Sequence, residues 1–165
     1  MRIVLDTNVL SELRLPAPDP SVMRWFDAID PEQAAIASFI IAEIHYGIAA
    51  LRTRDQVFAE QLQIWAQTLV DATPILPLNA RAGAILGQML TNPALRPFAV
   101  APPQARRPRF GGDLIIAATA LAHNAGLATR NIADFTLIAA HWPDPSVING
   151  RSRFVMAGLG PAIHD

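Results

Sequence analysis

The sequence contains no cysteine among its 165 residues. Disulfide bonds, thiolate zinc sites and cysteine nucleophiles are therefore excluded, and the composition is typical of a protein from a reducing compartment. Lysine is absent as well, so arginine supplies all 13 basic side chains against 14 acidic ones. This near balance argues against a general binder of polyanions, although it permits a local basic patch beside an acidic pocket.

Long apolar runs are also missing. No segment reaches the roughly 18 uninterrupted apolar residues that a membrane-spanning helix requires, and the N-terminus lacks the charged and then apolar pattern of a secretion signal. We therefore expect a cytoplasmic protein that does not enter a membrane. Because 52% of the residues are hydrophobic and only 16% are charged, we predict a single globular domain with one well-buried core.

Short apolar runs alternate along the chain with segments of helical periodicity. Strands are predicted at residues 2–5, 34–38, 75–76 and 127–129, with 147–148 as a further candidate. Helices are predicted at residues 20–29, 39–52, 55–70, 79–91 and 113–126. Strands that alternate with helices are typical of a parallel sheet covered on both faces, so the sequence predicts an α/β fold.

The predicted helices differ in how they pack. Those at 39–52 and 55–70 carry apolar stripes and are predicted to be antiparallel partners. The helix that begins at Asp113 is apolar nearly all round, so we predict that it is buried, capped by Asp113 and closed by Gly126.

The segment at 92–111 contains five prolines, which predicts a long loop without a helix. A loop of this length in a small domain is usually functional or mobile. The arginines at 106, 107 and 109 are either nucleic-acid contacts or solvated surface residues.

Two acidic residues stand where a strand ends or a helix begins. Asp6 directly follows the first predicted strand, and Asp113 follows Gly111 and Gly112 at the start of the buried helix. Each could simply cap a helix N-terminus. In a parallel α/β sheet, however, the carboxyl ends of the strands and the N-termini of the helices share one edge, where ligands bind. We therefore expect both carboxylates in one pocket.

Glu43 is harder to explain as a surface residue. It lies among Ile40, Ile41 and Ile44, where an ionised carboxylate must be paired, protonated or bound to a metal. Three acids in one pocket would repel one another and raise each other's pKa. A divalent cation relieves this repulsion, and oxygen ligands without cysteine favour Mg²⁺ or Mn²⁺ over zinc.

Polar residues after the last predicted strand could complete such a site. Asn131 and Asp134 would lie near the same edge and could supply an oxygen ligand directly or through water, although both residue types also form turns. Thr129 could donate a hydrogen bond to a carboxylate or to a scissile phosphate. The candidates for substrate contacts are Thr7, Asn8, Thr129 and Arg130.

Four sequence blocks carry a resemblance to a known family: LDTNVLSEL (5–13), AEIHYGI (42–48), GDLIIAATALAHN (112–124) and TRNIADF (129–135). In order and spacing they resemble the PIN domain, and within that family the VapC-type toxins of bacterial toxin–antitoxin modules. The resemblance makes residues 1–148 one PIN domain and leaves 149–165 as a C-terminal tail outside it. It implies an α/β/α sandwich with a short central parallel sheet.

The resemblance also implies an activity and the residues that perform it. The activity is a Mg²⁺- or Mn²⁺-dependent endoribonuclease, with Asp6, Glu43 and Asp113 as the catalytic acids that hold the metal. In many relatives a fourth acid stands where this chain has Asn131, so a second metal site would depend on Asp134. The implied partners are RNA and a cognate VapB-like antitoxin. The apolar helices at 39–70 offer a surface for the antitoxin or for the homodimer that we expect.

Two other functions are compatible with parts of the pattern. A haloacid-dehalogenase-like phosphatase also has an Asp at the end of its first strand. It needs a second acid two residues later, where this chain has Asn8, and a lysine, which is absent. A catalytically silent member that binds RNA or a partner without cleavage is disfavoured by the intact set of three acids. The substitution at Asn131 keeps this second alternative open.

Overall fold

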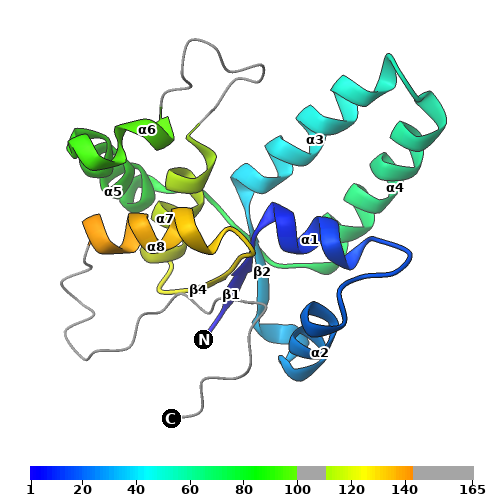
Figure 1. The fold of residues 1–165 in the computed structure, drawn as a ribbon, viewed down its shortest axis with the longest axis horizontal. Helices are drawn as coiled ribbons and strands as arrows, with labels where there is room; N and C mark the ends of the chain where they lie inside the picture. The colour runs from blue at the N-terminus through cyan, green and yellow to red at the C-terminus, as the bar shows by residue number, and fades with distance from the viewer. Residues whose placement is uncertain (100–110, 143–165) are drawn as a thin grey trace.

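The computed structural model describes residues 1–99 and 111–142, which form a four-stranded sheet between two groups of helices (Figure 1). The strands are β1 (Ile3–Leu5), β2 (Ala34–Ala37), β3 (Ile75–Leu76) and β4 (Gly126–Ala128). All pairings are parallel, in the order β3-β2-β1-β4, so the predicted α/β fold is confirmed. The candidate strand at 147–148, the tail at 149–165 and the arginines at 106, 107 and 109 lie outside the described residues.

The central strand β1 sets the position of the residues that follow it. Val4 pairs with Ala35 of β2 on one side and with Leu127 of β4 on the other. β1, β2 and β4 are buried along their whole length, which explains why they appear in the sequence as uninterrupted apolar runs. The backbone N–H of Asp6 donates to the carbonyl oxygen of Ala128 (2.9 Å). The first residue beyond β1 is therefore fixed at the carboxyl edge of the sheet.

Eight helices surround the sheet in the described part of the chain. To the right of the sheet in Figure 1 lie α1 (Thr7–Leu13), α2 (Pro20–Ala28), α3 (Ser38–Arg52) and α4 (Gln56–Ala72). To the left lie α5 (Ala80–Thr91), α6 (Arg96–Ala99), α7 (Gly112–Ala122) and α8 (Ile132–His141). The helices predicted at 20–29, 39–52, 55–70 and 79–91 are confirmed, whereas α1, α6 and α8 are additional. None of the helices within residues 1–99 and 111–142 is long and apolar enough to cross a membrane.

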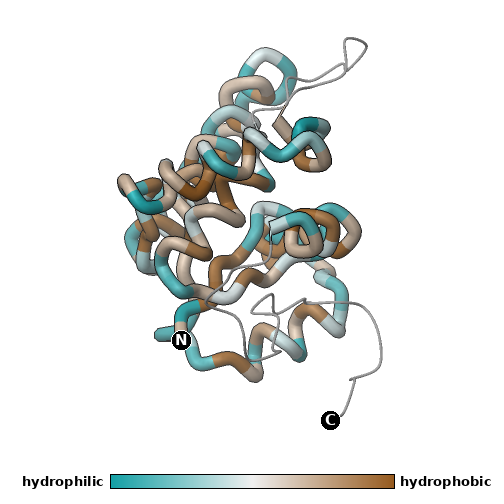
Figure 2. The backbone as a smooth tube through the Cα atoms, turned by 90° about the vertical axis from the view of Figure 1, so that its left-hand side faces the viewer, coloured by the Kyte–Doolittle hydropathy of each residue, from teal (hydrophilic) through white to brown (hydrophobic). Residues whose placement is uncertain are grey.

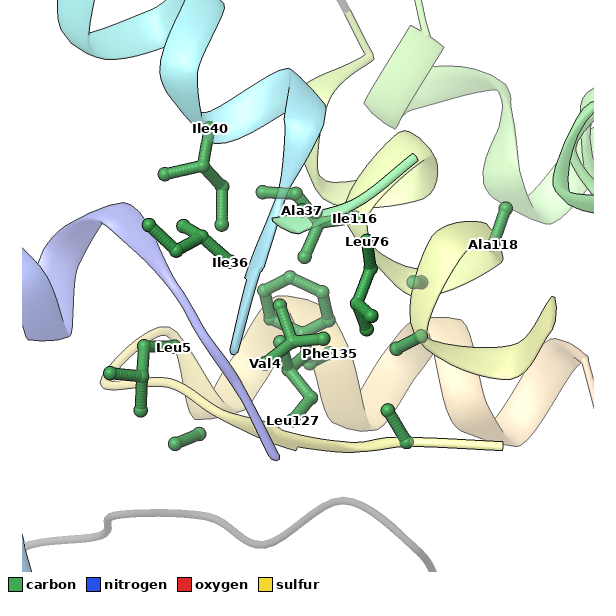
Figure 3. Close-up of a cluster of buried hydrophobic side chains, with 14 of the residues drawn as sticks. Val4, Leu5, Ile36, Ala37, Ile40, Leu76, Ile116, Ala118, Leu127 and Phe135 are labelled. Atoms are coloured by element: carbon green, nitrogen blue, oxygen red, sulfur yellow. The ribbon is translucent and has the colours of Figure 1, made fainter. Parts of the chain in front are cut away.

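The main core lies between the sheet and the helices α7 and α8. Figure 3 shows Val4 and Leu127 clustered with Ile116 of α7 and Phe135 of α8 on one face of the sheet, whereas Ile36 of β2 points to the opposite face. None of these five side chains is more than 1% exposed. As predicted, α7 is buried nearly all round, and its many alanines allow it to pack closely against the neighbouring elements.

The antiparallel pair of α3 and α4 was correctly predicted. Ile48, Ala59 and Ala66 form a small second core between the two helices, and Trp65 packs against both this core and the main one. Figure 1 shows the pair extending away from the sheet, and Figure 2 shows the turn at its far end, at the top of the view, as hydrophilic. The pair is thus anchored to the domain at the end near the sheet.

Both boundaries of α7 differ from the prediction. Its N-cap is Gly111, in the left-handed conformation (φ 65°), and Asp113 lies in the first turn instead. At the other end, α7 stops at Ala122 and Asn124 makes the left-handed turn (φ 51°), while Gly126 already belongs to β4. The prediction that Asp113 and Gly126 mark the ends of this helix was therefore wrong. Gly111 and Asn124 take the left-handed positions at its two ends, because Gly and Asn adopt this backbone conformation at lower cost than other residues.

The proline-rich segment is more regular than predicted. It begins with a 3-10 helix at Pro93–Leu95 and continues as α6. Pro93 occupies the first position, where its missing N–H costs nothing, and Asn92 caps the turn by accepting the N–H of Ala94 (3.0 Å). Leu95 and Phe98 are buried in the main core. The prediction of a helix-free loop was therefore wrong for residues 93–99, and the rest of it, 100–110, lies outside the described residues.

Candidate active site

A cavity of about 600 Å³ opens at the carboxyl edge of the sheet. Its wall includes Asp6 after β1, Glu43 on α3 and Asp113 on α7. The other lining residues are Thr7, Asn8, Ser11, Glu12, Arg14, Leu15 and Arg130. The structure therefore brings together carboxylates from three distant segments, because all three segments begin or end at the same edge of the sheet.

Asp6 is the most buried of the three acids, at 4% exposure. Its carboxylate accepts hydrogen bonds from the backbone N–H of Thr7 (2.6 Å), the side-chain amide of Asn8 (2.7 Å) and the hydroxyl of Thr129 (2.5 Å). Burial raises the pKa of Asp6, while these three hydrogen bonds lower it. Asp6 is also the N-cap of α1. The same carboxylate thus caps a helix and lines the cavity.

Thr129 and Asn8 join the ends of β4 and β1. The Asn8 amide also lies 3.2 Å from the Thr129 hydroxyl, and the Asn8 side-chain oxygen accepts the backbone N–H of Arg130 (2.9 Å). The backbone N–H of Asn131 donates to the Thr129 hydroxyl oxygen (2.9 Å). Thr129 is fully buried, so its hydroxyl contacts Asp6 rather than the cavity, whereas Asn8 and Arg130 line the cavity wall.

Glu43 is held by a hydrogen bond from another candidate residue. The hydroxyl of Thr7 donates to Glu43 Oε2 (2.5 Å). Burial raises the pKa of Glu43, the hydrogen bond from Thr7 lowers it, and the negative charge of Asp6 raises it further. Across residues 1–99 and 111–142, no arginine forms an ion pair with Glu43. The repulsion that the sequence predicts among buried acids is therefore present between Asp6 and Glu43.

Gly112 allows α7 to approach Glu43 closely. A Cβ atom at this position would lie 2.5 Å from Glu43 Oε1 and 3.0 Å from the ring atom Cε1 of Phe39. A contact of 2.5 Å is far shorter than real Cβ atoms make, so glycine is required for this arrangement. Gly111 contributes the left-handed backbone at which the helix starts. The Gly-Gly pair thus brings the start of α7, and Asp113 with it, beside Glu43.

Asn131 lies between two carboxylates at the start of α8. Its amide nitrogen donates to Asp134 Oδ2 (2.9 Å) and lies 3.5 Å from Asp113 Oδ2. In this orientation Asn131 presents N–H groups to the acids rather than its oxygen. Asp134 lies in the first turn of α8 and contacts Asn131 without reaching the cavity wall that the described residues form. The two candidates for the fourth position therefore contact each other.

Glu12 and Arg14 belong to the cavity although the motif blocks do not identify them as functional. Glu12 on α1 forms an ion pair with Arg130, and Arg14 follows at the end of the same helix. A sequence signal for Glu12 does exist. Asn8, Ser11 and Glu12 have the i, i+3, i+4 spacing of one helical face, so a helix predicted from residue 7 would have placed them together.

The cavity has the donor chemistry of a site for a hard divalent cation. Its acids offer only oxygen atoms, and burial raises the pKa of both Asp6 and Glu43, so a bound cation would stabilise their ionised forms. As the side chains stand in the two described ranges, no group of three or more His, Asp or Glu residues is arranged to hold a metal ion. The three carboxylates share one cavity, and Mg²⁺ is commonly held by one or two carboxylates together with water molecules.

Comparison with known proteins identifies close relatives. The chain is 36% identical over 138 residues to VapC ribonuclease Y4jK of Sinorhizobium fredii. The matched residues cover 81% of this chain and 89% of that protein. It is 31% identical over 135 residues to toxin FitB of Neisseria gonorrhoeae, with 81% of this chain and 90% of that protein covered.

A solved structure and a family model agree with these relatives. The crystal structure of FitAcB from Neisseria gonorrhoeae matches 82% of this chain and 92% of its own, with a TM-score of 0.61 and 28% identity. The family model described as PIN domain matches residues 3–139. The chain therefore belongs to the PIN domain family, as a member of its VapC-type toxins.

Proposed function

We propose that this protein is the toxin of a type II toxin–antitoxin module and acts as an endoribonuclease that requires Mg²⁺ or Mn²⁺. The observation that carries the proposal is the gathering of Asp6, Glu43 and Asp113 on one cavity at the carboxyl edge of a parallel sheet. The relatives support it, since one is named a ribonuclease and another a toxin.

Hydrolysis of a phosphodiester needs an activated water, an acceptor for its proton and stabilisation of the departing oxygen. We assign Asp6, Glu43 and Asp113 to hold the cation. Asp134 or Asn131 would supply a further oxygen ligand, either directly or through water. When bound, the cation would polarise the phosphate and lower the pKa of a coordinated water. Water attacks phosphorus in line with the 3′-oxygen, which leaves, so the product carries a 5′-phosphate.

The residues around the acids orient them for this reaction. Thr129 and Asn8 fix the carboxylate of Asp6, and Thr7 fixes Oε2 of Glu43. Glu43 either completes the ligand set or accepts the proton of the attacking water. Its raised pKa suits the second role, because a general base works best when its pKa lies nearer to neutral pH.

The substrate that we propose is single-stranded RNA in a structured context, because unpaired nucleotides can be splayed into a cavity. Asn8 and Arg130, on the cavity wall, are the proposed contacts. Since RNA is the substrate, we place the reaction in the cytoplasm.

The proposed partner is a VapB-like antitoxin, in keeping with the toxin group to which the chain belongs. A segment of the antitoxin would present an arginine to the acidic cavity and so neutralise the carboxylates. The surface of α3 and α4 is available for the antitoxin or for a homodimer. Several apolar side chains of these helices are exposed: Tyr46, Val57, Phe58 and Ile64.

An RNA cleavage assay with Mg²⁺, Mn²⁺ or EDTA tests the proposed activity. Asp6→Asn and Asp113→Asn should each lower the cleavage rate by at least about a hundredfold if these acids hold the cation. Asp27→Asn, which alters an exposed acid of α2, is the matched control and should cleave normally.

Two results would replace the proposal with another function. Tight RNA binding without cleavage in any metal would favour a silent binding module. Release of inorganic phosphate from small phosphate esters would favour a phosphatase.

A further inference from the structure

Arg14 is the C-terminal cap of α1 and lines the cavity beside the acids. Its guanidinium carbon lies 5.3 Å from the centre of the Phe58 ring and 5.9 Å from that of the Trp65 ring. Both rings belong to α4, where residues seven positions apart share one face. Arg14 therefore reaches from α1 to α4 and rests on two aromatic rings. Such contacts hold a long side chain in place and reduce the entropy that it loses when it binds a ligand.

The charge of Arg14 has no acidic partner in the part of the chain that the structure describes. Two arginines line the cavity, and Arg130 is already paired with Glu12. No carboxylate of residues 1–99 or 111–142 lies at ion-pair distance from Arg14. Ring contacts use none of the N–H donors of a guanidinium, so Arg14 can still bind an anion.

We propose that Arg14 binds a backbone phosphate of the RNA strand that flanks the scissile phosphate, with Phe58 and Trp65 as the residues that position it. This inference rests on the proposed ribonuclease function. The lining residues include four carboxylates and two arginines, so an arginine that is not already in an ion pair favours the approach of a polyanion. A planar guanidinium binds phosphate through two parallel hydrogen bonds. Because phosphates recur at every nucleotide, Arg14 adds affinity without preference for a base.

The test measures RNA binding by the full-length chain that carries Asp113→Asn, so that the RNA is not cleaved. Anisotropy of a labelled single-stranded RNA is recorded in Mg²⁺ over a range of salt concentrations. Arg14→Gln should weaken binding about fivefold to tenfold and reduce the slope of log K against log salt by about 0.7, the value for one phosphate contact on a single strand. Arg14→Lys should restore the slope but only part of the affinity, because lysine lacks the planar fork.

Two further variants separate charge from positioning. Arg24→Gln removes an exposed arginine of α2 that does not line the cavity, and it should leave both affinity and slope unchanged. Phe58→Leu removes one ring but keeps the charge, so it should weaken binding about twofold to fivefold and leave the slope intact. In the cleaving enzyme, Arg14→Gln should raise KM and leave kcat within about twofold of the wild type.

Unchanged affinity and slope in Arg14→Gln would overturn the proposal. A lower melting temperature in that case would show that Arg14 only joins α1 to α4. Normal RNA binding with weakened antitoxin binding would assign Arg14 to the protein partner and would equally refute it. If the wild type cleaves no RNA in any metal, the proposed function fails, whereas the salt slope still decides whether Arg14 contacts RNA.

Discussion

Replacing Gly112 with alanine adds one methyl group at the point where α7 meets α3. The new Cβ atom would lie 2.5 Å from Glu43 Oε1, whereas ordinary contacts begin near 3.4 Å, so the carboxylate must retreat by about 0.9 Å. Hydrogen bonds between a hydroxyl and an oxygen acceptor span only about 2.5 to 3.0 Å. A displacement of this size is enough to break the 2.5 Å hydrogen bond from Thr7 to Glu43.

The fold should tolerate this substitution. Gly112 is the first residue of α7 and does not have a left-handed backbone, so alanine there gains about 0.5 to 1 kcal/mol of helix propensity. The atom in closest contact is the end of a flexible side chain, and Phe39 Cε1, at 3.0 Å, must give by only a few tenths of an ångström. We therefore expect the free energy of unfolding to change by less than about 1 kcal/mol.

Catalysis should be far more sensitive than stability. A displacement of about 1 Å in a reacting group costs about a hundredfold in rate, so kcat/KM for RNA cleavage by Gly112→Ala should fall about a hundredfold. Urea unfolding and RNA cleavage are measured on the same preparation. Gly87→Ala is the matched control, because Gly87 lies in α5 with nothing within 4 Å of a Cβ atom, and it should keep full activity.

A double variant tests whether the loss arises at Glu43. Aspartate is one methylene shorter than glutamate, so in the Glu43→Asp background the added methyl group of Gly112→Ala meets a carboxylate that is already withdrawn. Adding Gly112→Ala there should therefore lower the rate much less than it does in the wild type. Full activity of Gly112→Ala alone, or a loss of activity that unfolding accounts for, would refute the reasoning.

Three further perturbations test the acids, their hydrogen bonds and the core. Because burial raises the pKa of Glu43 above 4.5, the folded state without metal holds this proton more tightly than the unfolded state does, and stability falls as pH rises from 4.5 through the raised value. Glu43→Gln should flatten this fall in thermal melts recorded in EDTA, and an identical pH profile would contradict it. Thr129→Val removes the buried hydroxyl that donates to Asp6, so it should lower the free energy of unfolding in urea by about 1 to 3 kcal/mol and slow RNA cleavage. The control Thr68→Val alters an exposed threonine of α4 and should lower the free energy of unfolding by less than about 0.5 kcal/mol. Phe135→Ala leaves a cavity at a fully buried position, so it should lower the free energy of unfolding in urea by about 3 to 5 kcal/mol. A loss below about 1 kcal/mol would be incompatible with the described core.

Local sequence patterns were sufficient for the strands and for most helices. The apolar runs at β1, β2 and β4 and the stripes of α3 and α4 depend on neighbouring residues, so their periodicity predicts them directly. The same patterns placed Asp6 and Asp113 at the edge of the sheet, because a strand end and a helix start are visible in the sequence. α1 has only seven residues, which is too short for an apolar stripe to repeat, and it is therefore not predicted.

The contacts that fix the acids were decided only by the tertiary structure. Thr7 and Glu43 are 36 positions apart, and Asp6 and Thr129 are 123 positions apart. Their proximity depends on the strand order β3-β2-β1-β4 and on how closely α7 packs against α3 at Gly112. Periodicity carries no information about such distances, because it records only which face of an element is buried and not which element covers that face.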